Sequence, residues 1–255
     1  MQNFHTHTYR CHHAKGSDRE YVEAAIKAGY TEIGFSDHTP YFFPADYYSD
    51  FRMKPSETEE YVNSIRALQE EYRDKITIRL GFEVEYYPQL FDKLLKFLKP
   101  FNYDYLILGQ HFTNNEFDEK SFYSGHKTSS IEVLDTYIQQ TLEALKTGEF
   151  LYFAHPDLIN YTGDKKIYEE RMRCFLKELK KLNIPLECNF LGFGDKRNYP
   201  NKTFWKLAAK ENNPVVIGLD AHQSEVYLDK KRLDKMKKFL DDLGIKPIEN
   251  LKIEK

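Results

Sequence analysis

Seven short β-rich runs recur along the chain, and each is followed by a segment with helical spacing. Strict β-then-α alternation predicts parallel strands with helices outside them, because a right-handed crossover helix must pack back onto the sheet. We expect the strands at Asn3–His5, Glu32–His38, Thr77–Glu85, Tyr105–His111, Phe150–His155, Pro185–Asn189 and Val215–Asp220.

Helix start and stop signals support this alternation. Ser17 with Glu20, and Ser56 with Glu59, have the S-x-x-E spacing of a capping box, in which side chains satisfy the free amides of a helix start. The length of 255 residues matches the ~250 over which one β/α barrel is usually built. We therefore expect an α/β fold, a distorted (β/α)7 TIM-like barrel, with residues 1–255 forming one domain. Further helices are expected at Leu90–Leu98, Val133–Leu145, Met172–Leu182, Phe204–Ala209 and Leu233–Leu243.

Side chains that bind metal ions or transfer protons stand at or near the ends of six expected strands, namely His5, His38, Glu83, His111, His155 and Asp220. In β/α barrels the carboxyl ends of the strands and the loops after them form the active-site face. We therefore expect these side chains to meet at one rim. A single strand-end histidine often only binds a backbone carbonyl, but so many charged groups at one rim are too costly without a cation.

The spacing within the first and last clusters also favours a metal site. His5 and His7 are one residue apart, so on an extended backbone they project to the same side, and Asp220 and His222 repeat this geometry. Mixed imidazole and carboxylate ligands suit Zn²⁺, Mn²⁺ or Fe²⁺, and their number implies more than one ion. Cys11 lies inside the first cluster, where we expect an inert thiol.

Composition excludes several other classes of protein. The net charge of −3 provides no general basic field for a nucleic-acid backbone. No apolar run approaches the ~20 residues that cross a bilayer, so no membrane partner is expected. Three widely spaced cysteines without a CxxC pair are typical of a reducing compartment, and we expect a cytoplasmic protein. The sequence leaves the oligomeric state open.

Six short motifs resemble the polymerase and histidinol phosphatase (PHP) family, and within it the histidinol-phosphatase branch. The resemblance runs nearly end to end and implies a metal-dependent phosphomonoester hydrolase, acting on L-histidinol phosphate in histidine biosynthesis. The motifs are HTHTYRCHH at 5–13, SDHTP at 36–40, GFEVEY at 81–86, GQH at 109–111, AHPD at 154–157 and GLDAH at 218–222.

The resemblance also implies a ligand set for two to three divalent ions. The family places one histidine in the loop where this chain has His12 and His13, and the offset from His5 favours His13. Glu83 and Glu85 share a strand face, and only the family pattern selects Glu83 as the bridging ligand. The implied first site takes His5, His7, Glu83 and Asp220, the second Glu83, His111 and His155, and the third His13, His38 and His222.

In the mechanism that the resemblance implies, a metal-bridging hydroxide held by Glu83 and Asp220 attacks phosphorus in line. His126 is a candidate acid for the leaving alkoxide, and Arg197 and Lys15 are candidate phosphate contacts. The chain departs from the family at 151–153, where histidinol phosphatases often carry an arginine.

Three alternatives follow for the function. The first and favoured one is hydrolysis of a small-molecule phosphate monoester, with L-histidinol phosphate as the substrate. The second is a PHP-type phosphoesterase that acts on phosphotyrosine in proteins or on nucleotides. The third is a non-catalytic metal-binding barrel, which the intact set of candidate ligands disfavours.

Overall fold

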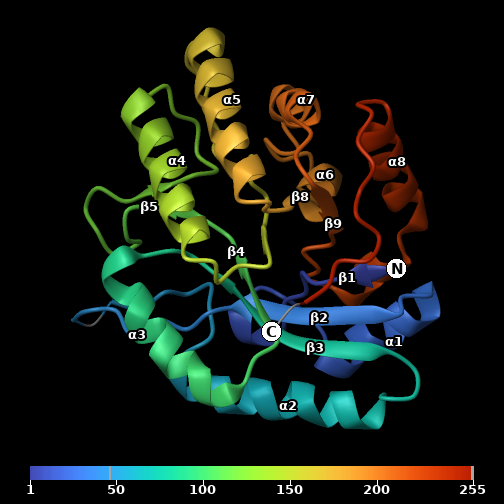
Figure 1. Ribbon diagram of the computed structural model, residues 1–255. Helices are drawn as coiled ribbons and strands as arrows, with labels where there is room; N and C mark the ends of the chain where they lie inside the picture. The colour runs from blue at the N-terminus through green and yellow to red at the C-terminus, as the bar shows by residue number, and fades with distance from the viewer. Residues whose placement is uncertain (46, 254–255) are drawn as a thin grey trace.

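The computed structural model describes residues 1–45 and 47–253. Parallel strands form a seven-stranded sheet in the order β1-β2-β3-β4-β7-β8-β9, which curls into a nearly closed barrel with helices around it (Figure 1). The predicted α/β barrel is therefore confirmed. Its strands are β1 (Gln2–Asn3), β2 (Glu32–His38), β3 (Thr77–Val84), β4 (Tyr105–Leu108), β7 (Tyr152–Phe153), β8 (Leu186–Asn189) and β9 (Val215–Gly218).

The barrel closes where the segment after β1 meets the segment after β9. Thr6 and Ala221 form an isolated parallel bridge at this seam. The amide of Ala221 donates to the carbonyl of His5 over 3.1 Å, and the amide of His7 donates to the carbonyl of Ala221 over 3.0 Å. Closure therefore brings the first histidines of the chain beside Asp220, more than two hundred residues later in the sequence.

The outer layer contains the predicted helices with some changed boundaries. α5 begins well before the predicted Met172, because the Asp164 side chain accepts from the amides of Lys166 and Ile167. The short α6 and a β-hairpin of β5 (Phe112–Thr113) and β6 (Phe122–Tyr123) were not predicted. The helices are α1 (Asp18–Ala28), α2 (Thr58–Glu71), α3 (Pro88–Leu98), α4 (Ile131–Lys146), α5 (Lys165–Lys181), α6 (Phe190–Asp195), α7 (Lys202–Glu211) and α8 (Lys230–Asp241).

Of the two predicted capping boxes, one forms. The Ser17 amide donates to the Glu20 carboxylate at the start of α1, as predicted. The prediction for Ser56 and Glu59 is wrong, because the chain first makes a 3₁₀ turn in which the Lys54 amide donates to Glu57 Oε2 over 2.6 Å.

Alternate residues of each strand point to opposite faces, which separates an outer from an inner core. On β3 the outward Leu80, Phe82 and Val84 pack against the helices. Inside the barrel, Tyr105, Ile107 and their neighbours form a smaller apolar cluster that fills the space below the site. The same alternation turns Glu83 and Glu85 inward.

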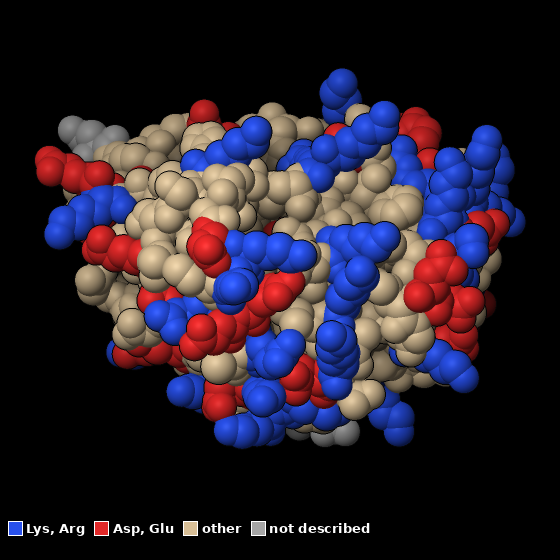
Figure 2. Space-filling view, turned by 90° about the horizontal axis from the view of Figure 1, so that it is seen from above, with Lys and Arg blue, Asp and Glu red and all other residues tan. Residues whose placement is uncertain are grey.

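The surface carries both signs of charge. Seen from above, Lys and Arg side chains are interspersed with Asp and Glu over this face (Figure 2). Among residues 1–45 and 47–253, no helix has the length and apolar character needed to cross a membrane.

Candidate metal centre

Glu83 lies at the centre of a cluster of buried imidazoles. It is only 1% exposed, and its Oε1 lies 2.9 Å from His155 Nε2 and 4.0 Å from His111 Nε2. Its Oε2 faces three other histidines: His38 Nδ1 at 3.0 Å, His7 Nε2 at 3.5 Å and His5 Nε2 at 3.6 Å. The alternation of β3 thus places one carboxylate between rings that come from β2, from the segment after β1 and from the segments after β4 and β7.

Asp220 forms the second carboxylate of the cluster. Its Oδ1 lies 3.2 Å from His7 Nε2, 3.5 Å from His5 Nε2 and 3.3 Å from His222 Nδ1. The backbone of Asp220 has φ of 50°, in the left-handed region that non-glycine residues seldom adopt. Such local strain is typical of functional sites, where the surrounding structure holds a side chain in a required direction.

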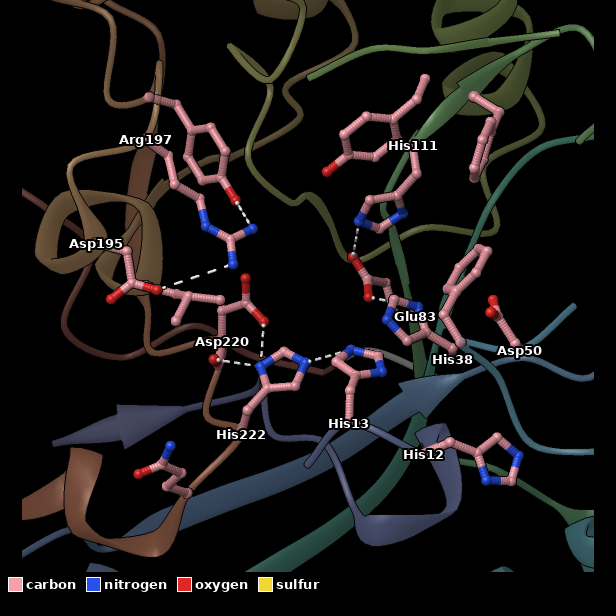
Figure 3. A pocket seen from close by; sticks show the side chains of 16 residues that line it. His12, His13, His38, Asp50, Glu83, His111, Asp195, Arg197, Asp220 and His222 are labelled. Atoms are coloured by element: carbon pink, nitrogen blue, oxygen red, sulfur yellow. Dashed lines mark hydrogen bonds and ion pairs between the residues drawn. The ribbon is translucent and has the colours of Figure 1, made fainter. Parts of the chain in front are cut away.

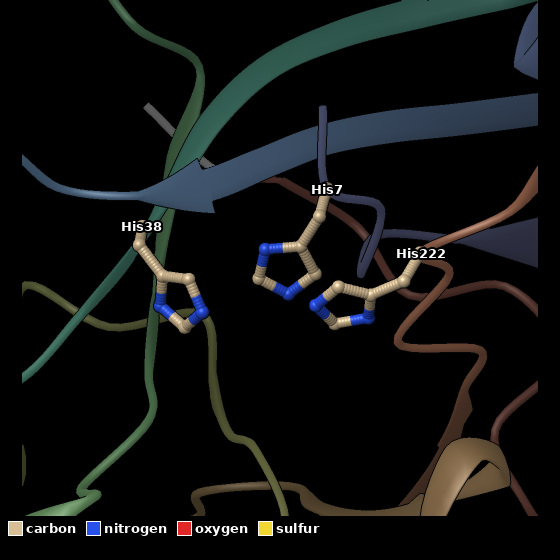
Figure 4. A group of neighbouring side chains, drawn as sticks. All are labelled: His7, His38 and His222. Carbon is tan, nitrogen blue, oxygen red and sulfur yellow. The ribbon is translucent and has the colours of Figure 1, made fainter. Parts of the chain in front are cut away.

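The remaining predicted ligands join the cluster from the side of the barrel seam. His13 Nε2 lies 2.9 Å from His222 Nε2, and His7, His38 and His222 turn their rings toward a common space (Figure 4). His12 instead points to the Tyr48 hydroxyl, 3.1 Å from its Nε2. The structure therefore places His13, and not its neighbour, with the other rings.

The donor set fits a group of divalent cations. His5 Nε2 and His7 Nε2 face each other at 3.1 Å and are fully buried, a separation at which both ring nitrogens can bind the same cation. Burial lowers the pKa of His5, but the Glu187, Asp220 and Glu83 carboxylates outweigh it and raise that pKa to about 10. Three carboxylates therefore act on this one ring, and a cation could take the place of its second ring proton. Nitrogen and oxygen donors of this mixture suit Zn²⁺, Mn²⁺ and Fe²⁺.

Three further carboxylates that were not predicted from the sequence support the imidazoles from behind. Glu187 Oε1 lies 2.8 Å from His5 Nδ1, Asp37 Oδ1 lies 3.4 Å from His7 Nδ1, and Glu85 Oε1 lies 2.7 Å from His111 Nδ1. Metal-binding histidines commonly donate their second ring N–H to a carboxylate, which fixes the tautomer and orients the ring. The sequence signal that could have identified Glu187 was its position as a charged residue inside the apolar run of β8.

Cys11 is buried next to the site. Its Sγ and ring nitrogens of His13 and His222 all lie within 4.8 Å of one another. Burial raises the pKa of the Cys11 thiol, which opposes formation of the thiolate that binds metals. The inert thiol therefore stays a prediction.

A pocket of about 660 Å³ opens above the cluster (Figure 3). Arg197 projects into it, with Nη1 donating to the Tyr199 hydroxyl over 3.2 Å, and Asp195 lies 3.8 Å from Arg197 Nη2. Lys15 and His126 are not among its lining residues, so their proposed roles stay predictions. The lining residues are His12, His13, His38, Asp50, Phe51, Glu83, His111, Phe112, Tyr123, Leu191, Asp195, Arg197, Tyr199, Asp220, His222 and Gln223.

Comparison with known proteins agrees with this geometry. The model of the PHP domain matches residues 3–190. The chain belongs to the PHP domain family. Its relatives include a probable histidinol-phosphatase from Deinococcus radiodurans, 30% identical over 223 residues that cover 86% of this chain and 85% of the relative. The histidinol-phosphatase of Bacillus subtilis is 27% identical over 250 residues, covering 86% of this chain and 92% of the relative.

The PHP fold is also seen in a solved structure. Histidinol phosphate phosphatase from Lactococcus lactis, determined in complex with zinc, L-histidinol and phosphate, superposes on this chain with a TM-score of 0.75. The match covers 100% of this chain and 98% of that protein at 22% sequence identity. The likeness establishes a common architecture, and the family resemblance of the motifs is confirmed.

Proposed function

We propose that this PHP protein is a histidinol-phosphatase, a metal-dependent phosphomonoesterase that hydrolyses L-histidinol phosphate to L-histidinol and phosphate. The observation that carries the proposal is the convergence of nine candidate ligands, Glu83 among them, in one cluster of which six members line an open pocket. Relatives that match over most of their own length and are named histidinol-phosphatases support the choice of substrate.

The proposed ligand set follows the family pattern. Glu83 and Asp220 would hold a first ion with His5 and His7, and Glu83 would hold a second with His111 and His155. His13, His38 and His222 would hold a third. The short distances among these donor atoms support the assignment of two to three ions, with zinc, manganese and iron as candidates.

Bound divalent ions would supply a water that loses its proton near neutral pH and would neutralise charge that develops on the phosphoryl oxygens. The chain itself prepares the ligands for this role. Glu187 holds a proton at His5 Nδ1, and Glu85 holds one at His111 Nδ1. Because these carboxylates are acceptors, the Nε2 lone pairs of both rings stay free for a cation.

The pocket also supplies contacts that suit a phosphate ester of an amine. Arg197 is the arginine among its lining residues, and its guanidinium can bind two phosphate oxygens at once. Asp50 and Asp195 line the same pocket, where a carboxylate can bind an ammonium group (Figure 3). Phe51, Phe112 and other aromatic rings provide an apolar wall for an imidazole ring.

A steady-state assay tests the substrate assignment. We expect the metal-loaded protein to hydrolyse L-histidinol phosphate with a kcat/KM about 100-fold above that for p-nitrophenyl phosphate, a phosphotyrosine peptide or a nucleoside monophosphate. Metal-depleted protein is the control. Turnover of histidinol phosphate no faster than that of p-nitrophenyl phosphate would exclude the specific assignment, and turnover without metals would exclude the metal-dependent mechanism.

The proposal includes a cellular context. A histidinol-phosphatase belongs to histidine biosynthesis, and we place it in the cytoplasm with the whole chain working as one PHP-type domain. The free state of Cys11, Cys174 and Cys188 agrees with a reducing compartment.

A further inference from the structure

Arg52 is a buried charge to which the proposed reaction assigns no role. Its side chain is only 2% exposed, although it comes from a long irregular segment between β2 and α2. A buried guanidinium is tolerated only where carboxylates and further acceptors surround it. Nη1 donates to Glu85 Oε2 over 2.8 Å, and Nη2 donates to Glu116 Oε2 over 2.6 Å. The carbonyl of Thr39 and the hydroxyl of Ser49 accept its other hydrogen bonds, each over 3.0 Å.

The Glu85 carboxylate connects this arginine to the metal centre. One of its oxygens accepts from Arg52, and the other lies 2.7 Å from His111 Nδ1. The two oxygens of this one buried carboxylate thus bind a guanidinium and an imidazole, and the direction of Glu85 toward the His111 ring depends on the bond to Arg52.

The same arginine holds one wall of the pocket. Its guanidinium lies 4.4 Å from the centre of the Phe51 ring, and Phe51 and Asp50 both line the pocket. The Phe51 ring in turn contacts His38 at 5.3 Å and Phe112 at 5.8 Å between centres. Residues 39–45 and 47–54 contain no helix or strand, so side-chain contacts such as these fix the course of this segment.

We propose that Arg52 is a positioning residue with two linked effects: through Glu85 it orients the metal ligand His111, and through Phe51 it sets the pocket wall that Asp50 and Phe51 form. This inference rests on the metal centre of the proposed function but not on the identity of the substrate. Loss of Arg52 therefore weakens the binding of one metal ion and the binding of substrate together. Loss of the Glu85 charge weakens mainly the binding of the metal ion.

Zinc titration of the metal-free protein, with a chromophoric chelator as competitor, tests the first effect. We expect Arg52→Met and Glu85→Gln to lower the affinity for one zinc ion about 10- to 100-fold. This range is typical of changes to residues that hydrogen-bond to a metal ligand. Glu116→Gln is the matched control. It removes the other carboxylate partner of Arg52 but leaves the Glu85–His111 contact, so we expect zinc affinity near that of the unmodified protein.

The second effect is tested by steady-state kinetics on p-nitrophenyl phosphate at saturating zinc. We expect Arg52→Met to raise KM several-fold more than Glu85→Gln does, because only Arg52 also supports Phe51. Circular dichroism and thermal unfolding of the metal-free variants report whether they fold. If Arg52→Met is unfolded, Arg52→Lys replaces it in both tests. The lysine keeps the buried charge but cannot bridge both carboxylates. We therefore expect the same losses of zinc affinity and substrate binding, but smaller ones.

Three results would overturn the proposal. Zinc affinity of folded Arg52 variants equal to that of the unmodified protein would exclude positioning through Glu85. An equal loss of zinc affinity in Glu116→Gln would indicate instead that any change around Arg52 disturbs the segment that carries it. An unmodified protein that binds no zinc would overturn the metal centre together with this inference, whereas a normal zinc centre without turnover of histidinol phosphate would affect only the proposed substrate.

Discussion

His5 Nδ1 lies 2.8 Å from Glu187 Oε1, and both side chains are fully shielded from solvent. Glu187 comes from β8, whereas the ring that it supports belongs to the segment after β1. Its second oxygen accepts from Asn189 Nδ2 over 2.9 Å, and the same amide group donates to Asp220 Oδ2 over 3.0 Å. Glu187 and Asn189 thus connect two proposed ligands, one on each side of the barrel seam.

Glu187→Gln tests this support. We expect the zinc ion at His5 to bind about 10- to 100-fold more weakly, because the ring loses the charged acceptor that fixes its tautomer. Activity at low zinc should fall and recover at high zinc. The matched control is Glu178→Gln, which removes the same charge from the exposed surface of α5. Equal zinc affinity of the two variants would contradict a role for Glu187 at the site.

Gly109→Ala tests how tightly the central carboxylate is confined. A Cβ atom at this position would lie 1.9 Å from Glu83 Oε1, so Glu83 must move. A displacement of about 1 Å in a catalytic site commonly lowers the rate about 100-fold, and we expect a loss of that order in kcat/KM. Gly148→Ala is the control, because nothing lies within 4 Å of its Cβ and its positive φ affects stability only. Full activity of the Gly109 variant would contradict the central role of Glu83.

The two adjacent histidines of the first motif should differ in metal binding. His13 faces His222, whereas His12 contacts Tyr48. We therefore expect His13→Ala to lower the number of tightly bound ions per chain and His12→Ala to leave it unchanged. Elemental analysis after gel filtration measures both. The opposite order would reassign the third site to His12.

Arg197→Ala should weaken binding of the phosphate group. Hydrogen bonds to charged groups contribute about 1.5–3 kcal/mol, so we expect KM to rise roughly 10- to 100-fold with a smaller change in kcat. Lys15→Ala provides the comparison, because Lys15 does not line the pocket and its loss should change KM less. A larger effect at Lys15 would reverse the two predicted assignments.

Removal of the metal ions should lower both activity and thermal stability. Ions that bind only the folded chain stabilise it, so chelation shifts the unfolding temperature downward and added zinc restores it. Protons compete with metals for imidazole nitrogens, and zinc affinity should therefore decrease as the pH falls below neutrality. Differential scanning calorimetry across this range measures the shift. An unchanged unfolding temperature after verified removal would contradict a metal centre built into the barrel.

Local sequence patterns predicted much of the fold and of the candidate ligand set. The β-then-α alternation predicted the parallel barrel, because strand and helix periods are set by residues close in sequence. Histidines and acids at strand ends predicted the rim, since parallel strands end on the same side of a barrel. The start of α5 and the hairpin of β5 and β6 were missed, because caps and short strands leave weak signals.

The sequence by itself determined the order of the seven barrel strands and which side chains reach the rim, because backbone periodicity carries that information. Only the tertiary structure decided which partner supports each ring. Glu187 and His5 are 182 residues apart, and Arg52 meets Glu85 from an irregular segment. Such pairings depend on side-chain direction and on closure of the barrel. The strand and helix periodicity of the sequence does not encode these side-chain pairings. The low dielectric of the protein interior makes the pairings strong.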